Sequence, residues 1–145
     1  MKKDQKLKLF GVAAVTAATL LFSVPVFAAS NTVAITSATT SSGKVLANDA
    51  ASAPAIEKAE LVTINTTISS AGADVTLMVV NNAVDPTTSA VTEADIKYID
   101  QDTSDGTTGN CSITFRMPLN VQAGTYAVYV AGEGVASKNT KYLKI

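Results

Sequence analysis

One stretch near the C-terminus constrains the fold more than any other part of this chain. Residues 124–130 alternate between two faces, with Tyr126, Val128 and Val130 on one face and Ala127 and Tyr129 on the other. Side chains alternate in this way along an extended strand. Because large apolar residues lie on both faces, the stretch predicts a central strand of a β-sandwich.

Five more segments after residue 60 alternate in the same way. They lie at residues 60–68, 75–80, 111–117 and 140–145, with one more strand that starts at Ile96. Turn-forming residues separate them, and residues 69–73 (Ser-Ser-Ala-Gly-Ala) are expected to form a hairpin loop. A shorter alternation at residues 32–36 supplies a seventh strand, and helical periodicity of any length occurs only before residue 28. The pattern predicts an all-β sandwich of about seven strands.

The first 28 residues have the pattern of a secretory signal peptide. Four lysines precede an apolar run from Leu9 to Phe27, and residues 26–28 (Val-Phe-Ala) form a small-residue cleavage site. An uncleaved membrane anchor is the alternative, because a run of about 20 apolar residues can span a bilayer. Pro25 near the end of the run favours cleavage. We therefore expect cleavage after Ala28 and an extracellular or cell-surface protein.

The remaining chain divides into two parts of different composition. Residues 29–54 are rich in Ala, Ser and Thr and are expected to be mostly linker, while residues 55–145 are expected to form the sandwich domain. Removal of residues 1–28 takes away four lysines and one aspartate and leaves a net charge of −4. Nucleic-acid binding needs clustered Lys and Arg, so the acidic balance argues against such a partner.

The single cysteine, Cys111, has no partner for a disulfide within the chain. It alternates with polar residues and falls on the same face as Ile113 and Phe115, so it is expected to be a small buried hydrophobe. The alternative is an intermolecular disulfide, which an odd cysteine in an exported protein always raises.

Four short motifs, in order, carry a resemblance to a known family. They are residues 95–101 (Asp-Ile-x-Tyr-Ile-Asp-Gln), 113–118 (Ile-x-Phe-x-Met-Pro), 123–126 (Ala-Gly-Thr-Tyr) and 132–134 (Gly-x-Gly). Over about residues 57–145 the chain resembles the immunoglobulin-like repeats in extracellular proteins of Gram-positive, often clostridial, bacteria. The resemblance implies an immunoglobulin-like or fibronectin III-like antiparallel sandwich. Such modules act as spacers, adhesive units or parts of surface assemblies rather than as enzymes.

Candidate ligand and catalytic residues are few. Asp100, Asp102 and Asp105 could supply oxygen ligands to Ca²⁺, but they also suit a solvated turn between strands, and we expect no metal or other cofactor. The chain has no histidine, so the usual base for a nucleophile is absent. From this we expect no catalytic residues and no enzyme.

Tyrosines offer a structural and a functional interpretation. Tyr98, Tyr129 and Tyr142 are candidates for a platform that stacks on sugar rings, although the chain has no tryptophan. Tyr126 opens a late strand two residues after Gly124. We expect its hydroxyl to bond to backbone, as in the tyrosine corner of immunoglobulin-like sandwiches.

The leading functional hypothesis is a secreted, non-catalytic structural protein of the cell surface or extracellular matrix that assembles into filaments. In it, the segment Thr32, Val33, Ala34, Ile35 and Thr36 pairs with an exposed sheet edge of the next copy. In the alternative, the same segment is the first strand of its own sandwich. The expected partners are copies of the chain or another surface protein, and no membrane span is expected after cleavage.

A second function class is an adhesion module that binds carbohydrate or protein. Loops on rigid sandwiches commonly carry binding sites, and residues 81–95 and 100–110 form the longest polar loops. The partner would then be a glycan or another surface protein.

Overall fold

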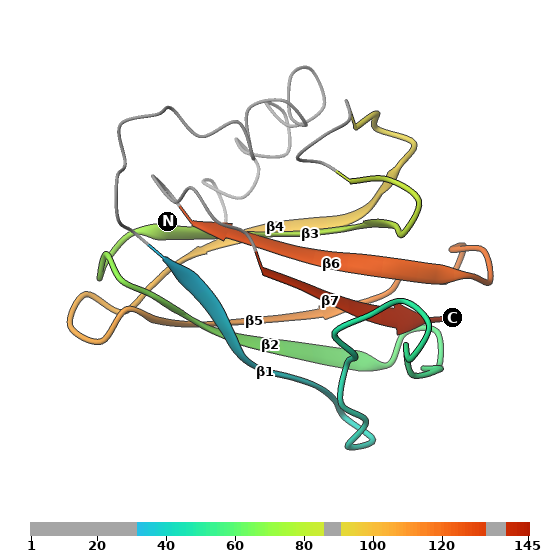
Figure 1. Cartoon of the computed structure of the whole chain (residues 1–145), viewed down its shortest axis with the longest axis horizontal. Coiled ribbons are helices and arrows are strands. Elements are labelled where there is room, and N and C mark those ends of the chain that lie inside the picture. The colour runs from blue at the N-terminus through green and yellow to red at the C-terminus, as the bar shows by residue number, and fades with distance from the viewer. Residues whose placement is uncertain (1–31, 86–90, 133–138) are drawn as a thin grey trace.

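The computed structural model describes residues 32–85, 91–132 and 139–145, and these form seven strands in two layers (Figure 1). The strands are β1 (Val33–Thr40), β2 (Leu61–Ile68), β3 (Asp74–Asn81), β4 (Ile96–Thr103), β5 (Asn110–Arg116), β6 (Thr125–Gly132) and β7 (Asn139–Lys144). The prediction of an all-β, immunoglobulin-like sandwich of about seven strands is confirmed. No helix within these ranges is long and apolar enough to cross a membrane. The predicted signal peptide lies outside the described residues.

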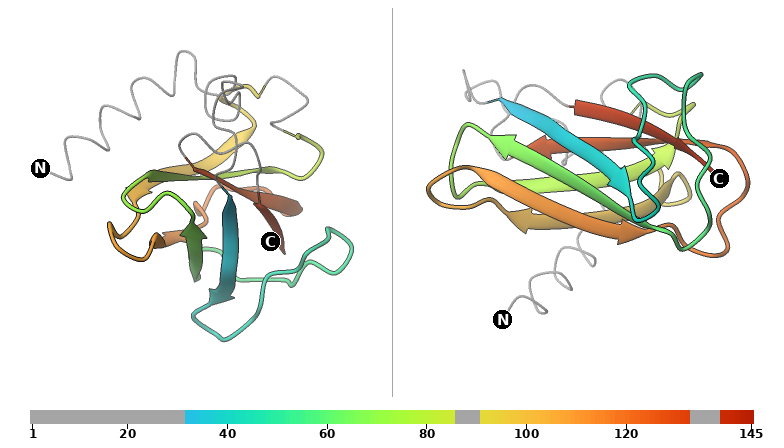
Figure 2. Two further views of the ribbon diagram at one scale, coloured as in Figure 1. Left: turned by 60° about the vertical axis from the view of Figure 1, so that its left-hand side comes forward. Right: turned by 90° about the horizontal axis from the view of Figure 1, so that it is seen from below.

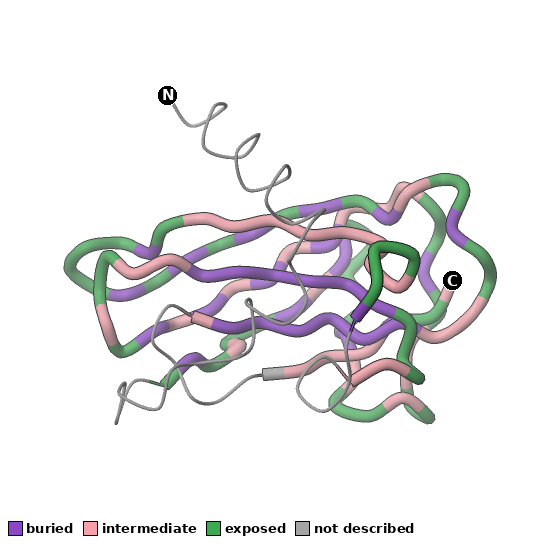
Figure 3. Tube along the Cα trace, turned by 90° about the horizontal axis from the view of Figure 1, so that it is seen from above, coloured by how far each residue is buried: buried purple, intermediate pink, exposed green. Residues whose placement is uncertain are grey.

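The strands form two antiparallel sheets, with β1 lying beside β2 in the views of Figure 2. Sheet A has the order β1-β2-β5, and sheet B has the order β4-β3-β6-β7. Strand β6 therefore lies between β3 and β7, as the alternation at residues 124–130 predicts. Strands β3 and β6 are buried along nearly their whole length (Figure 3).

The main core lies between the sheets and follows from the period of two. Strand β2 contributes Val62, Ile64 and Ile68, and β5 contributes Ile113 and Phe115, all of them almost fully buried. Sheet B supplies the facing side chains, among them Leu77, Val79, Val128, Val130 and Leu143. Because buried residues occupy every second position on β2 and β5, all apolar except Thr66, the remaining positions point outward to solvent.

A tyrosine corner fixes the start of β6. The Tyr126 hydroxyl donates a hydrogen bond to the backbone carbonyl of Gln122, four residues upstream, at 2.6 Å. The ring is buried, and burial raises the pKa of its hydroxyl. The predicted structural role of Tyr126 is confirmed.

A second apolar cluster covers the outer face of sheet B. Met78 and Val80 from β3 meet Ala127 and Tyr129 from β6, and Val91 from the β3–β4 connection packs on them. These side chains are buried although they point away from the main core. Sheet B is therefore covered on both faces, whereas the outer side chains of sheet A are exposed or half-buried.

The connection between β1 and β2 closes one side of the sandwich. The Leu46 amide donates to the Ala38 carbonyl of β1 at 2.9 Å, and the next residue, Ala47, exchanges two backbone bonds with Tyr142 of β7. Further along, the Lys144 amide donates to the Pro54 carbonyl. Residues 44–56 thus bridge the edges of β1 and β7, and the folded unit extends N-terminally of residue 55.

One local prediction is wrong. Residues 69–73 do not close a hairpin, because β2 pairs with β1 and β5 in sheet A while β3 pairs with β4 and β6 in sheet B. The segment is instead a crossing from one sheet to the other. Within sheet B, Val79 lies directly beside Val128 on the neighbouring strand.

Candidate functional site

The outer face of sheet A is an array of hydroxyl and amide side chains, which we call the polar face. Its members point outward from three neighbouring strands: Ser37 and Thr39 from β1, Thr63, Asn65 and Thr67 from β2, and Asn110, Ser112 and Thr114 from β5. The strand registers align them in rows across the sheet, because Ser37, Asn65 and Ser112 lie side by side, as do Thr39, Thr63 and Thr114. All eight are uncharged.

Side-chain hydrogen bonds join neighbouring strands in each row of the polar face. The Thr67 hydroxyl donates to Asn110 Oδ1 at 2.9 Å, and Asn65 Nδ2 donates to the Ser37 hydroxyl at 2.7 Å. In the third row the hydroxyls of Thr63 and Thr114 lie 3.0 Å apart. Cross-strand pairs of this kind contribute about 0.2–1 kcal/mol each, and they favour the rotamers in which the pairs form.

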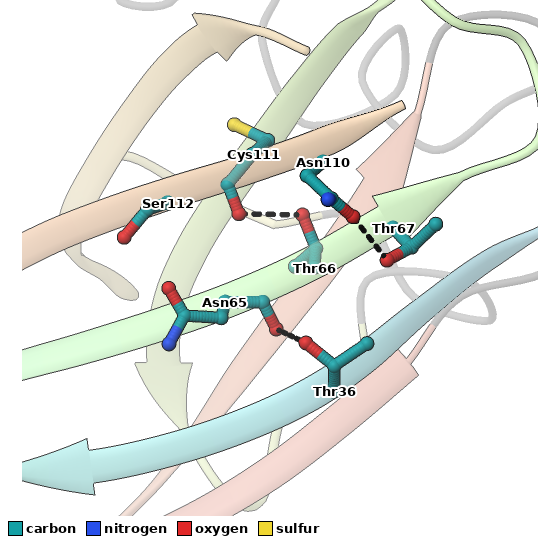
Figure 4. Close-up of a pocket in the computed structure, with 7 residues that line it drawn as sticks. All are labelled: Thr36, Asn65, Thr66, Thr67, Asn110, Cys111 and Ser112. Carbon is teal, nitrogen blue, oxygen red and sulfur yellow. Dashed lines mark hydrogen bonds between the residues drawn. The ribbon is translucent and has the colours of Figure 1, made fainter. Parts of the chain in front are cut away.

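A groove of about 400 Å³ lies over one end of the polar face (Figure 4). It is lined by Thr36, Asn65, Thr66, Thr67, Asn110, Cys111 and Ser112. Thr36 reaches the groove because β1 has a bulge between Ile35 and Ser37, and a bulge redirects a side chain. Its hydroxyl donates to the Asn65 carbonyl at 3.1 Å.

The groove keeps unused hydrogen-bonding capacity of both kinds. Within the described part of the chain, the side-chain oxygen of Asn65 accepts no hydrogen bond. Asn110 accepts from Thr67 at its side-chain oxygen, and its amide NH₂ remains a potential donor. The exposed Ser112 hydroxyl can both donate and accept. Donors and acceptors are thus mixed over a short distance, without a charged group in the lining.

The three aspartates weighed as calcium ligands, Asp100, Asp102 and Asp105, do not form a metal site in the structure. Within residues 32–85, 91–132 and 139–145, no three acidic, Cys or His side chains are placed to hold a metal ion. One Asp105 carboxylate oxygen already accepts from the backbone of Thr107 and Thr108, which lowers the pKa of this carboxyl. Asp100 accepts from the Tyr98 hydroxyl at 3.1 Å, and the Asp102 carboxylate accepts from the Thr103 amide. Asp105 therefore stabilises a turn, whereas Asp100 and Asp102 bond to neighbouring residues of β4.

The tyrosines do not form a platform for sugar rings. Tyr98 stacks on Phe115 with ring centroids 5.0 Å apart, and burial together with Asp100 raises the pKa of its hydroxyl to about 12. Tyr129 is only 4% exposed within the outer cluster of sheet B, and Tyr142 packs against the same cluster. The three rings contribute to packing on two different faces.

Cys111 is a buried free thiol, in agreement with the first of the two interpretations of its sequence position. Burial is the largest cause that raises the pKa of this thiol to about 11, and the nearby Asp102 charge adds to it. Since the thiolate is the reactive form, the residue is poorly suited to an intermolecular disulfide.

The N-terminal segment expected to pair with another copy pairs within its own chain. Val33 lies opposite Ile68 and Ala34 opposite Thr67 in the β1–β2 ladder. At the end of the ladder, the Thr32 carbonyl accepts from the Ser69 amide at 3.0 Å. The alternative from the sequence is therefore correct, because these backbone groups are already bonded to β2.

No protein-family model matches the chain, and no curated protein matches it. Among solved structures it is similar to a lytic polysaccharide monooxygenase (LPMO) from Kitasatospora papulosa, at 16% identity over 64% of this chain and 49% of that chain, with a TM-score of 0.40. It is also similar to a chitin binding domain from Burkholderia pseudomallei (12%, 64% and 55%, TM-score 0.41) and to a cellulose-active LPMO in complex with copper (14%, 62% and 50%, TM-score 0.38). The chain spans about half the length of these structures. At these identities the similarity concerns the sandwich fold.

Two expectations from the sequence are contradicted. The filament-forming structural protein is contradicted, because β1, the strand expected to pair with the next copy, pairs with β2 of its own chain. The expectation that the chain is no enzyme is contradicted by the matches to monooxygenases.

The residues of this chain do not fit a copper centre of the kind named in one matched structure. Copper in proteins takes imidazole, thiolate or thioether ligands. The sequence has no histidine, its only thiol is buried, and Met78 and Met117 belong to two different buried clusters. The described ranges also hold no group of three candidate ligand residues. We therefore derive no oxidative step for this chain.

Sequence reasoning did not single out the polar face. Its signal was nevertheless present, since Thr63, Asn65 and Thr67 alternate with the core residues of β2, and β5 repeats the pattern with Asn110, Ser112 and Thr114. The feature that could have indicated the polar face is a series of outward positions that hold only Ser, Thr or Asn and no charged residue.

Proposed function

We propose that this protein is an exported carbohydrate-binding protein whose groove on sheet A binds a neutral polysaccharide. One observation carries the proposal: the groove is lined by uncharged hydroxyl and amide groups that have hydrogen-bond donors and acceptors to spare. Export is supported by the signal-peptide pattern of residues 1–28.

The chemistry of the lining favours a sugar over a charged ligand. A charged ligand loses its hydration on binding and needs an opposite charge or a charge-assisted hydrogen bond in return. No lining residue supplies such a charge. A neutral polyol presents both donors and acceptors, and it can therefore bond to Asn65, Asn110 and Ser112 together.

The volume and residue types of the groove indicate the strength of binding. About 400 Å³ lies within the ~300–1,000 Å³ range of small-molecule sites. The lining contains no aromatic residue for ring stacking, so affinity depends on a few hydrogen bonds at about 1 kcal/mol net each. The cost of immobilising the ligand offsets part of this gain, so we expect short sugars to bind weakly, with dissociation constants in the millimolar range or above.

A glycan array and titration calorimetry with the purified protein test this proposal. Binding should be confined to neutral glycans and should change little as salt rises, because no ion pair is screened. Ser112→Lys places a charged side chain in the groove and should weaken binding at least about tenfold. Thr103→Lys adds the same charge to an exposed strand position of sheet B and should leave binding unchanged.

Two results would contradict the proposal. One is the absence of binding to any neutral glycan on the array. The other is equal binding by wild type and Ser112→Lys, which would place the binding surface elsewhere on the molecule.

A further inference from the structure

The polar face continues beyond the groove along β2 and β5. Past the row of Ser37, Asn65 and Ser112 lies a further row, in which the Thr63 and Thr114 hydroxyls pair at 3.0 Å. Thr39 of β1 aligns with Thr63 in the same row. At about 3.4 Å per residue, the row of Thr67 lies about 14 Å from the row of Thr63. The face is therefore longer than the groove.

The absence of charge on this face is unusual for its position in the fold. Strands β1 and β5 are the two outer strands of sheet A, and exposed outer strands commonly carry charged side chains that prevent unwanted pairing. Strand β4, at an edge of sheet B, has Lys97, Asp100 and Asp102. In contrast, the first charged side chain along β5 is Arg116, which follows the last row and is bonded to the Ala59 carbonyl.

A close neutral partner explains why charges would be unfavourable here. A charged side chain that a neutral ligand covers loses water without gaining a counter-charge. Removing water from paired hydroxyls and amides costs less free energy than removing it from a charged side chain. Each of these groups already holds one hydrogen bond within the sheet and keeps further bonding capacity for the ligand. The whole uncharged length of the face, and not the groove alone, then has the composition of a contact surface.

From this we infer that the ligand is an extended neutral polysaccharide chain that lies along β2 and β5 and contacts all three rows of the polar face. The inference rests on the proposed function, and it adds that the site binds an internal stretch of a chain. Because the rows follow the strands, each added row contributes its own hydrogen bonds. Affinity should therefore rise with the length of the chain until the row of Thr63 and Thr114 is covered.

The test is the dependence of affinity on oligosaccharide length, measured by calorimetry with cello- and chito-oligosaccharides of two, four and six units. Both series are neutral and have defined lengths. In at least one series, wild type should bind the longest oligosaccharide about two- to tenfold more tightly than the two-unit sugar. This is the gain expected for one net hydrogen bond to the row of Thr63 and Thr114, which lies beyond the groove.

Thr114→Lys separates the far row from the groove, because Thr114 is exposed and does not line the groove. The variant should keep wild-type affinity for the two-unit sugar and lose the gain with length. Thr103→Lys is the matched control, since Thr103 is also an exposed strand threonine whose hydroxyl makes a cross-strand bond, at 2.8 Å to Asp74. It should keep the full dependence on length.

Failure of this inference differs from failure of the proposed function. Length-independent affinity, or an undiminished gain with length in Thr114→Lys, would overturn the extended-chain inference while groove binding stands. No binding of any length, or binding that Ser112→Lys does not weaken, would overturn the groove and the inference together.

Discussion

Gly109 is the position where one added methyl group should damage the fold most clearly. It precedes β5, has φ of +72°, and its carbonyl accepts a hydrogen bond from the Ile68 amide at 2.9 Å. A Cβ atom at this residue would lie 2.1 Å from the Ile68 carbonyl oxygen. Backbone atoms cannot rotate away as a side chain can, so the segment must shift.

The expected cost of Gly109→Ala has two parts. A left-handed conformation costs a non-glycine residue about 1–2 kcal/mol, of which about 0.4–1 kcal/mol is offset because alanine restricts the unfolded chain. The forced shift weakens the hydrogen bond from Ile68, and a buried unsatisfied backbone group costs about 1–3 kcal/mol. We expect a net loss of about 3 kcal/mol, or a fall in Tm of about 10–15 °C for a domain of this size.

Two other glycines separate backbone strain from the steric clash. Gly72 also has a positive φ, +79°, but its added Cβ would have only Gly106 Cα within 4 Å, at 3.8 Å. Gly72→Ala should therefore cost only about 0.5–1 kcal/mol. Gly106 lacks a positive φ and an added Cβ meets nothing within 4 Å, so Gly106→Ala should be neutral or slightly stabilising.

Urea and thermal unfolding followed by circular dichroism would give the three free energies. The order of destabilisation should be Gly109, then Gly72, then Gly106. If Gly109→Ala lowered the free energy of unfolding no more than Gly72→Ala does, the close approach of Gly109 to Ile68 would not be present in solution.

Three further predictions concern individual side chains. Tyr126→Phe should lower the free energy of unfolding by about 1–2 kcal/mol, because it removes the 2.6 Å hydrogen bond to the Gln122 carbonyl. Tyr142→Phe should be nearly neutral in the same urea titration. Equal effects of the two substitutions would contradict the tyrosine corner. Hydrogen bonds from Ser and Thr hydroxyls and backbone amides lower the pKa of Glu60 from 4.5 to about 2, so its contribution is complete above about pH 4.5 and is lost as pH falls toward 2. Glu60→Gln should then flatten the acid part of the stability–pH curve, by less than about 1 kcal/mol because the Glu60 carboxylate is in contact with solvent. Glu57→Gln is the control and should leave the curve unchanged. An unchanged curve in Glu60→Gln would refute the role of the Glu60 carboxylate. Cys111, with its pKa raised to about 11, should react with a disulfide reagent at pH 8 at least about a hundredfold more slowly in the native protein than in urea, and rapid native reaction would show that it is accessible.

Much of the local structure could be predicted from sequence, because a period of two is a local property. The alternation in residues 60–68 correctly places Val62 and Ile64 inward, and the same reasoning places Cys111 on the buried face of its strand. Tyr126 was predicted from its position after a glycine at the start of a strand. Each of these conclusions depends only on neighbours within one strand.

Predictions that depended on strand pairing were less successful. The small residues 69–73 are compatible with a hairpin, yet they join the two sheets. The segment Thr32 to Thr36 lacked an obvious partner in the sequence because β2 begins more than 20 residues later and its outward residues look like those of any solvated strand. Partner choice depends on backbone bonds between distant segments, and composition does not specify it.

The candidate site shows the same division most clearly. The sequence by itself determined that Asn65 and Ser112 point away from the core, because the apolar residues beside them must point inward. Only the tertiary structure decided that they lie in one row with Ser37, since that requires the registers of β1, β2 and β5 to align. The bulge that turns Thr36 into the groove also appears only there. Side-chain direction is set within a strand, whereas a surface is set by how strands align, and this alignment formed the polar face.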